Sequence, residues 1–173
     1  MKVLIMRHTK ALHKDEANVL YDAERPLSEA GREDAKKLSD YLLSQGIKIG
    51  EILCSPFFRC HQTANIMASA LTENIQPKAL SILAPGSGVE DLMRAVINHA
   101  KGCKDWVLCV LHQPDVSHIL GSLICTDSSF TIPVRNGDLY ALNISNKHGL
   151  RNASLIFSYS IKNASHMLKE ANE

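Results

Sequence analysis

Val3-Leu4-Ile5-Met6-Arg7-His8-Thr9 begins with four apolar residues and continues directly into an arginine and a histidine. An apolar run of this length is typical of a short buried strand, so Arg7 and His8 are expected at the carboxyl end of a first strand. In open α/β sheets, ligands bind at that edge of the sheet. A histidine beside a fixed cation there indicates phosphate chemistry, although such a pair alone is more often just the polar end of a strand.

The chain that follows alternates between strand-like and helix-like segments. Strands are expected at residues 3–6, 49–54, 78–83 and 106–111. Helices are expected from an N-cap at Ser28 to Gly46, from Pro56 onward after an N-cap at Ser55, and at residues 89–100 and 116–125. A turn at residues 136–138 introduces an antiparallel hairpin of residues 139–144 and 155–161. This order predicts an α/β fold, a three-layer α/β/α sandwich with a mostly parallel central sheet and no cap domain.

Length and composition are those of one domain with one sizeable core. The chain has 173 residues, 45% of them hydrophobic, and we expect a single domain over residues 1–162 followed by a polar tail at 163–173. The 19 basic and 18 acidic residues leave a net charge of +1, which favours neither nucleic acid nor a membrane surface as a partner. Five cysteines without C-x-x-C spacing indicate a reducing compartment. We therefore expect a cytoplasmic monomer.

Polar residues that suit phosphate binding follow three of the expected strands. Arg7 and His8 follow the first, Ser55 and Arg59 follow the second, and His112 follows the continuously apolar strand at 106–111. Because parallel strands bring their carboxyl ends to one edge, these side chains should face a common crevice. Each residue alone has an ordinary structural explanation. Their placement at three strand ends is what indicates a site, which a further arginine, Arg25, can join from the loop after the first strand.

The motifs of the chain resemble those of the histidine phosphatase superfamily, which has the phosphoglycerate-mutase-like fold. The resemblance rests on Arg7-His8, on Arg25-Pro26-Leu27-Ser28-x-x-Gly31, on Ser55-Pro56-x-x-Arg59-x-x-x-Thr63-Ala64, and on the late His112, which occur in the expected order. The short length without an inserted cap and the S-P-F-x-R form are most similar to the bacterial SixA-type phosphohistidine phosphatases.

This resemblance implies a covalent mechanism that needs no metal and no cofactor. His8 would attack phosphorus to form a phosphohistidine intermediate, which water would hydrolyse. Arg7, Arg59 and His112 are the other expected catalytic residues. The phosphoryl group would be bound by Arg7, Arg25, Arg59, His112 and, at the edge, Ser55. Such an arrangement suits phosphoryl transfer, which depends on positioning and on neutralising the phosphoryl oxygens. Neighbouring guanidinium groups should also lower the pKa of His8 and keep the nucleophile neutral.

The expected activity is removal of phosphoryl groups from histidines of phosphorelay or phosphotransfer proteins. The sequence gives only weak evidence for a general acid. The candidate is Glu90, which is equally well explained as a first-turn residue of a helix. A phospho-imidazole needs such an acid less than a phosphoester does, because the leaving imidazole is far less basic than an alkoxide. The alternatives are a small-molecule phosphomonoesterase on the same scaffold and a phosphate-binding relative without activity.

Thr9 is where the sequence departs from the superfamily, which usually has glycine after Arg-His. A threonine there could crowd the phosphate or contribute its hydroxyl, and it would be strained if the position required a positive φ. The remaining histidines lack the spacing of metal ligands.

Overall fold

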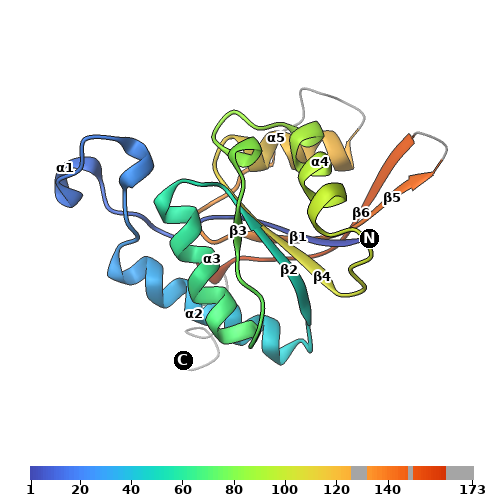
Figure 1. Cartoon of the computed structure of the whole chain (residues 1–173), viewed down its shortest axis with the longest axis horizontal. Helices are drawn as coiled ribbons and strands as arrows, with labels where there is room; N and C mark the ends of the chain where they lie inside the picture. The colour runs from blue at the N-terminus through green and yellow to red at the C-terminus, as the bar shows by residue number, and fades with distance from the viewer. Residues whose placement is uncertain (126–131, 148–149, 163–173) are drawn as a thin grey trace, which may run out of the picture.

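The protein is built around one mixed six-stranded sheet (Figure 1). The computed structural model describes residues 1–125, 132–147 and 150–162. The strand order is β3-β2-β4-β1-β5-β6, in which the first four strands run parallel and β5 and β6 are antiparallel to their neighbours. The expected mostly parallel sheet with a terminal antiparallel hairpin is therefore confirmed.

The elements follow one another in the alternating order expected from the sequence. The strands are β1 (Lys2–Arg7), β2 (Ile49–Cys54), β3 (Lys78–Ala79), β4 (Trp106–Leu111), β5 (Leu139–Lys147) and β6 (Leu150–Tyr159). The helices are α1 (Lys14–Ala17), α2 (Glu29–Ser44), α3 (Phe58–Leu71), α4 (Val89–His99) and α5 (Asp115–Ile124), with short 3-10 helices η1 (Asp22–Glu24) and η2 (Ser81–Leu83).

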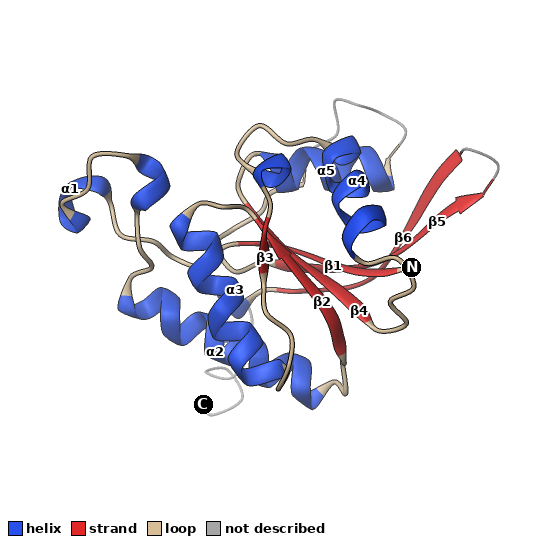
Figure 2. Cartoon of the chain, in the orientation of Figure 1, coloured by secondary structure: helices blue, strands red, loops and turns tan. Residues whose placement is uncertain are grey.

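Helices cover both faces of the sheet and make a three-layer sandwich (Figure 2). Helices α2 and α3 pack on one face, and α4 and α5 pack on the other. Strand β1 shows why, because Leu4 and Met6 contribute to the core under α2 and α3, whereas Val3 and Ile5 contribute to the core under α4 and α5. All four side chains are fully buried, as expected for a central strand covered on both faces.

The carboxyl ends of β1, β2 and β4 meet at one edge of the sheet. Strands β1 and β4 are adjacent and parallel, with Arg7 opposite Leu111, and the His8 N–H donates to the Leu111 carbonyl at 3.0 Å. The Ser55 N–H extends the ladder on the other side by donating to the Val110 carbonyl at 3.1 Å. A crevice is expected at this edge of the sheet, and Arg7, His8 and His112 lie there because each is at or directly after one of these strand ends.

Two expected elements differ from those observed. The third strand is only Lys78–Ala79, because the chain turns into η2 after the Leu80 N–H has bonded to the Cys54 carbonyl, which brings Leu83 into the core. Helix α3 begins at Phe58 with Phe57 as its N-cap, so Ser55 is not the cap. The Ser55 hydroxyl instead accepts from the Phe57 N–H in the turn before the helix. The expected tail at 163–173 lies outside the described residues.

Hydrogen bonds join the two ends of the segment between β1 and α2 where they cross. Ser28 caps α2 as expected, since its hydroxyl accepts from the Gly31 N–H at 3.1 Å and donates to the Lys10 carbonyl at 3.1 Å. A Cβ on Gly31 would lie 2.0 Å from that same carbonyl oxygen. The Ser-x-x-Gly spacing therefore lets the backbone that follows the first strand pass directly over the first turn of the helix.

Substituting Gly31 with alanine should destabilise the fold, although alanine normally favours a helix. The backbone carbonyl of Lys10 must move to admit the methyl group, and we expect a loss of about 2 kcal/mol or more in the free energy of unfolding. Gly88→Ala is the control, because a Cβ there meets nothing within 4 Å, and it should cost less than about 1 kcal/mol. Urea denaturation of both variants measures the difference, and an unchanged Gly31→Ala midpoint would contradict the crossing described here.

Candidate active site

His8 lies buried at the end of β1 with its two ring nitrogens in different surroundings. Its Nδ1 is 2.7 Å from the Thr9 carbonyl oxygen, which can only accept a hydrogen bond. Its Nε2 accepts a hydrogen bond from Arg59 Nε at 3.1 Å. The neutral tautomer with the proton on Nδ1 satisfies both contacts, and it leaves the lone pair on Nε2. The unprotonated nitrogen of His8 is therefore Nε2.

The surroundings of His8 hold it in the neutral state. Burial lowers its pKa to about 3, and the positive charges of Arg59 and Arg7 add to this effect, while the bond to the Thr9 carbonyl opposes it. A protonated imidazole could not act as a nucleophile. Burial and the neighbouring arginines thus produce the state that the sequence analysis expected.

Arg59, in the first turn of α3, has all three of its guanidinium nitrogens engaged. Besides the Nε bond to His8, Nη1 donates to the Asp22 carbonyl at 2.8 Å, and Nη2 forms an ion pair with the Asp22 carboxylate at 3.0 Å. The Arg59 side chain is only 8% exposed. The 3-10 turn η1, which follows α1, therefore closes over this arginine.

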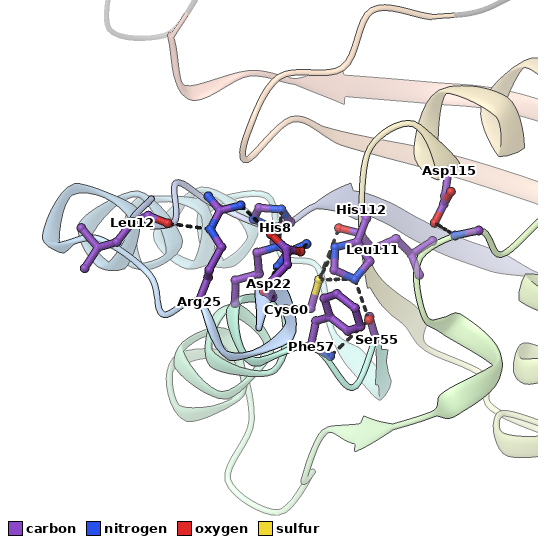
Figure 3. Close-up of polar contacts among 12 residues, drawn as sticks. His8, Leu12, Asp22, Arg25, Ser55, Phe57, Cys60, Leu111, His112 and Asp115 are labelled. Atoms are coloured by element: carbon purple, nitrogen blue, oxygen red, sulfur yellow. Dashed lines mark hydrogen bonds and ion pairs between the residues drawn. The ribbon is translucent and has the colours of Figure 1, made fainter. Parts of the chain in front are cut away.

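Arg25 joins the same carboxylate from the other side. Its Nη1 lies 2.9 Å from Asp22 Oδ1, and its Nε donates to the Leu12 carbonyl at 2.7 Å (Figure 3). Burial raises the pKa of Asp22, but hydrogen bonds and charges from Arg25 and Arg59 outweigh it, so that the pKa is lowered overall. Asp22 is consequently an ionised bridge between two arginines.

Arg7 provides a buried donor that the protein itself leaves unused. Its Nη1 donates to the Val134 carbonyl at 3.1 Å, whereas its Nε is buried and has no hydrogen-bond partner among the described residues. Burial and the charge of Arg59 lower the pKa of Arg7, against the opposing effect of Asp138. An unpaired buried N–H of a cation is costly, and an oxyanion at this position would satisfy it.

His112, at the start of the loop after β4, packs edge-on against His8 with ring centroids 5.6 Å apart. Its Nε2 lies 2.6 Å from the Ser55 hydroxyl, and the Cys60 sulfur lies 3.6 Å from the same nitrogen (Figure 3). Burial lowers the pKa of His112 to about 4, with Arg59 and Arg7 acting in the same direction and Asp22 opposing them. Burial also raises the pKa of the Cys60 thiol, so His112 has an uncharged neighbour.

These side chains open into a cavity of about 350 Å³, within the usual range for small-ligand sites. Its lining consists of Arg7, His8, Lys10, Ala11, Arg25, Arg59, His112, Gln113 and Asn136. Five residues singled out in the sequence therefore come together. Ser55 is brought to His112 and not to the cavity lining. Glu90 is exposed in the first turn of α4 and is not part of the lining either.

Asp115 fixes the segment that leads to Glu90. Its carboxylate, buried at the start of α5, accepts from the Gly86 N–H at 3.0 Å (Figure 3). This bond holds the loop before α4 against α5. A role for Glu90 as general acid stays a prediction.

The sequence analysis missed four polar residues of the site. Lys10 and Gln113 line the cavity and could have been found, since they lie two residues after His8 and directly after His112. Asn136, whose side-chain amide donates to the His8 carbonyl at 3.3 Å, belongs to the turn that was read only as a hairpin signal. Asp22 had the signal of lying one helical turn before Arg25, but nothing in the sequence indicated its pairing with Arg59.

Thr9 has a structural role on the protein side of His8. Asn18 is the one non-glycine residue with a positive φ in the described part of the chain, so Thr9 does not adopt the conformation in which threonine would be strained. Thr9 is fully buried, and its hydroxyl and its N–H both lie 3.3 Å from Thr63 Oγ1, which donates to the Arg59 carbonyl at 2.8 Å. Thr9 thus ties the end of β1 to the first turn of α3.

No group of three or more histidine, cysteine, aspartate or glutamate side chains is arranged to hold a metal ion within residues 1–125, 132–147 and 150–162. None of the helices in the same ranges is both long and apolar enough to cross a membrane.

This arrangement of a neutral histidine among three arginines at a parallel sheet edge is that of a phosphoryl-transfer enzyme, and comparison with known proteins identifies the class. The family model of the histidine phosphatase superfamily (branch 1) matches residues 3–82, so the chain contains a histidine phosphatase superfamily domain. The phosphohistidine phosphatase SixA of Escherichia coli strain K12 is 29% identical over 126 residues, which are 71% of this chain and 74% of the relative.

Solved structures show the same fold. The protein histidine phosphatase SixA, in complex with tungstate, superposes with a TM-score of 0.79 at 24% identity over 95% of this chain and 99% of the other. The alpha-ribazole phosphatase from Shigella flexneri superposes with a TM-score of 0.59 at 18% identity, over 90% of this chain and 95% of the other. The phosphoglycerate-mutase-like α/β fold expected from the sequence is confirmed.

Both active-site histidines should remain neutral well below the pH at which a free histidine becomes charged. The lowered pKa values mean that, between about pH 6.5 and pH 4, the unfolded chain takes up protons at these positions that the folded protein does not. The folded state should therefore lose stability as the pH falls through this range. NMR of ring-labelled protein, assigned with His8→Gln and His112→Gln, should show neutral rings at pH 5. Titration of either ring near pH 6.5 would contradict this account.

Proposed function

We propose that this protein is a phosphohistidine phosphatase that removes phosphoryl groups from the histidines of phosphorelay or phosphotransfer proteins. The observation that carries the proposal is the position of His8 Nε2, which is neutral and points at Arg59 in a cavity that Arg7 and Arg25 also line. The similarity over most of its length to a phosphohistidine phosphatase supports this choice of substrate.

The reaction takes place in two displacements at phosphorus. In the first, the lone pair of His8 Nε2 forms a bond to phosphorus while the bond from phosphorus to the substrate imidazole breaks, and the imidazole leaves as a neutral ring when it carries a proton on its other nitrogen. In the second, water attacks the phosphorus on Nε2, inorganic phosphate leaves, and His8 regains its lone pair. The Nδ1–H bond to the Thr9 carbonyl keeps the ring in one orientation through both steps.

The cationic groups stabilise charge on the equatorial oxygens of the transferring group. Arg7, Arg25 and Arg59 line the cavity, and Arg25 and Arg59 divide their N–H donors between the phosphoryl oxygens and Asp22. His112 donates from Nε2 after exchanging its contact with the Ser55 hydroxyl. Before that exchange, the Ser55 hydroxyl holds the His112 ring in place. The reaction so described uses no metal ion.

The surface beside the cavity suits a protein substrate. Leu20 and Tyr21 immediately precede Asp22 and are 81% and 68% exposed, and Phe58, next to Arg59, is 44% exposed. Large apolar side chains so exposed at the edge of an active site favour contact with a macromolecule. Among the described residues no additional domain covers the cavity, which leaves room for a histidine presented on a folded partner.

A second candidate is a small-molecule phosphomonoesterase, because the fold is shared with an alpha-ribazole phosphatase. An alkoxide leaving group requires a proton donor, and Glu90, the candidate donor, is not part of the cavity lining. This placement favours cleavage of a P–N bond over cleavage of a P–O bond.

Single-turnover release of phosphate tests the proposal. A histidine-phosphorylated carrier protein and a generic phosphomonoester are each mixed with excess enzyme in the presence of a chelator, and the loss of phosphoryl label is followed. We expect release from the carrier at least about a hundredfold faster than from the ester. His8→Ala should reduce the rate by about 10⁴-fold or more, as loss of a covalent nucleophile does.

Each other outcome selects an alternative. Faster release from the ester, lost in Glu90→Gln, would assign the small-molecule activity. Binding of phosphate without turnover of either substrate would assign the non-catalytic role.

A further inference from the structure

The Asp22 carboxylate occupies donors that a phosphoryl group needs. Its Oδ1 lies 2.9 Å from Arg25 Nη1 and its Oδ2 lies 3.0 Å from Arg59 Nη2. A carboxylate and a phosphoryl group offer similar pairs of anionic oxygens to a guanidinium fork. The two anions therefore compete for the same two arginines.

Each guanidinium nitrogen of Arg59 already has one partner, so that three of its five N–H donors are engaged. Its Nε bonds to His8 Nε2, its Nη1 to the Asp22 carbonyl and its Nη2 to the Asp22 carboxylate. A bidentate contact of Arg59 with a phosphoryl group uses two neighbouring nitrogens and therefore competes with these contacts. In this resting arrangement Arg59 also covers the lone pair that must attack phosphorus.

The structure also indicates that Asp22 can be displaced. Its side chain is 48% exposed and lies in a three-residue 3-10 turn. The loop that carries this turn is pinned at its ends, where the Leu12 N–H donates to the Pro26 carbonyl and Ala11 bridges to Leu27. A part-exposed ion pair contributes little free energy, whereas a phosphate dianion in the cavity would carry more charge than the carboxylate and would also face Arg7, which lines the same cavity.

We propose that Asp22 is an exchangeable internal counter-ion of the phosphate site, which holds Arg25 and Arg59 in the resting enzyme and is displaced from them by the phosphoryl group. Because the Asp22 carboxylate competes with phosphate for these arginines, the affinity for free phosphate is lowered and the product is released readily. The inference deepens the proposed function, since it rests on the same site, but it does not depend on which phosphorylated substrate the enzyme uses.

The test is the affinity of the full-length protein for inorganic phosphate, measured by titration calorimetry. Asp22→Asn and Asp22→Ala should each bind phosphate about threefold to tenfold more tightly than the unsubstituted protein, the range expected when a part-exposed competing ion pair is removed. Asp15→Asn is the matched control. It removes one negative charge from the same loop, where Asp15 is 92% exposed and lies 3.2 Å from His13, and it should leave the affinity within about twofold.

The direction of the change separates this role from a purely structural one. If Asp22 only held the arginines in place, its removal would weaken phosphate binding. Weaker or unchanged binding in both Asp22 variants, or equal tightening in Asp15→Asn, would overturn the inference. Tighter binding in an enzyme that fails to release phosphate from a phosphohistidine carrier would uphold the counter-ion and refute the proposed substrate instead.

Discussion

The parallel pairing of β1 with β4 is the constraint on which the site depends. It sets Arg7 opposite Leu111 and bonds the His8 N–H to the Leu111 carbonyl, so the residues that follow each strand are side by side. His8 and His112 meet there edge to edge. Helix α3, which starts just after the neighbouring strand, then brings Arg59 to His8 Nε2. A shift of one residue in this register would turn His8 away from the cavity, because successive side chains of a strand point to opposite faces.

Burial and positive charge act together at this edge to keep His8 neutral inside a cationic cavity. Either alone would lower the pKa of His8, and the fold applies both. The same concentration of arginines would be costly in a buried site without an anion. The chain supplies one in Asp22, which bridges Arg25 and Arg59. The segment after β1 therefore carries both His8 and, in its 3-10 turn, the carboxylate that pairs with two arginines of the cavity.

Much of the architecture could be predicted because short-range patterns determine it. Buried parallel strands are continuous apolar runs, and the Ser28 cap and the strand-end residues depend on near neighbours in the sequence. Side-chain pairing across the fold could not be predicted in the same way. Ser55 reads as a helix cap but contacts His112, which is 57 residues away, and nothing in the sequence indicates that Asp22 pairs with Arg59. The predicted third strand is too long because the apolar residue Leu83 was assigned to it. Leu83 is buried in the core, but it reaches the core from a 3-10 turn and not from a strand. Backbone strain at Thr9 was expected only if the position required a positive φ, which it does not.

The central claim is that His8 attacks phosphorus through Nε2 while Nδ1 stays bonded to the Thr9 carbonyl. The most direct test is to identify the nitrogen that becomes phosphorylated. Enzyme labelled with ¹⁵N in its histidine rings is mixed with a phosphorylated carrier, quenched at alkaline pH, where phosphohistidine survives, and examined by ³¹P and ¹⁵N NMR. The account predicts phosphorus bonded to Nε2 of His8 alone. Phosphorus on Nδ1, on another histidine, or on no residue of an enzyme that nevertheless turns over would contradict it.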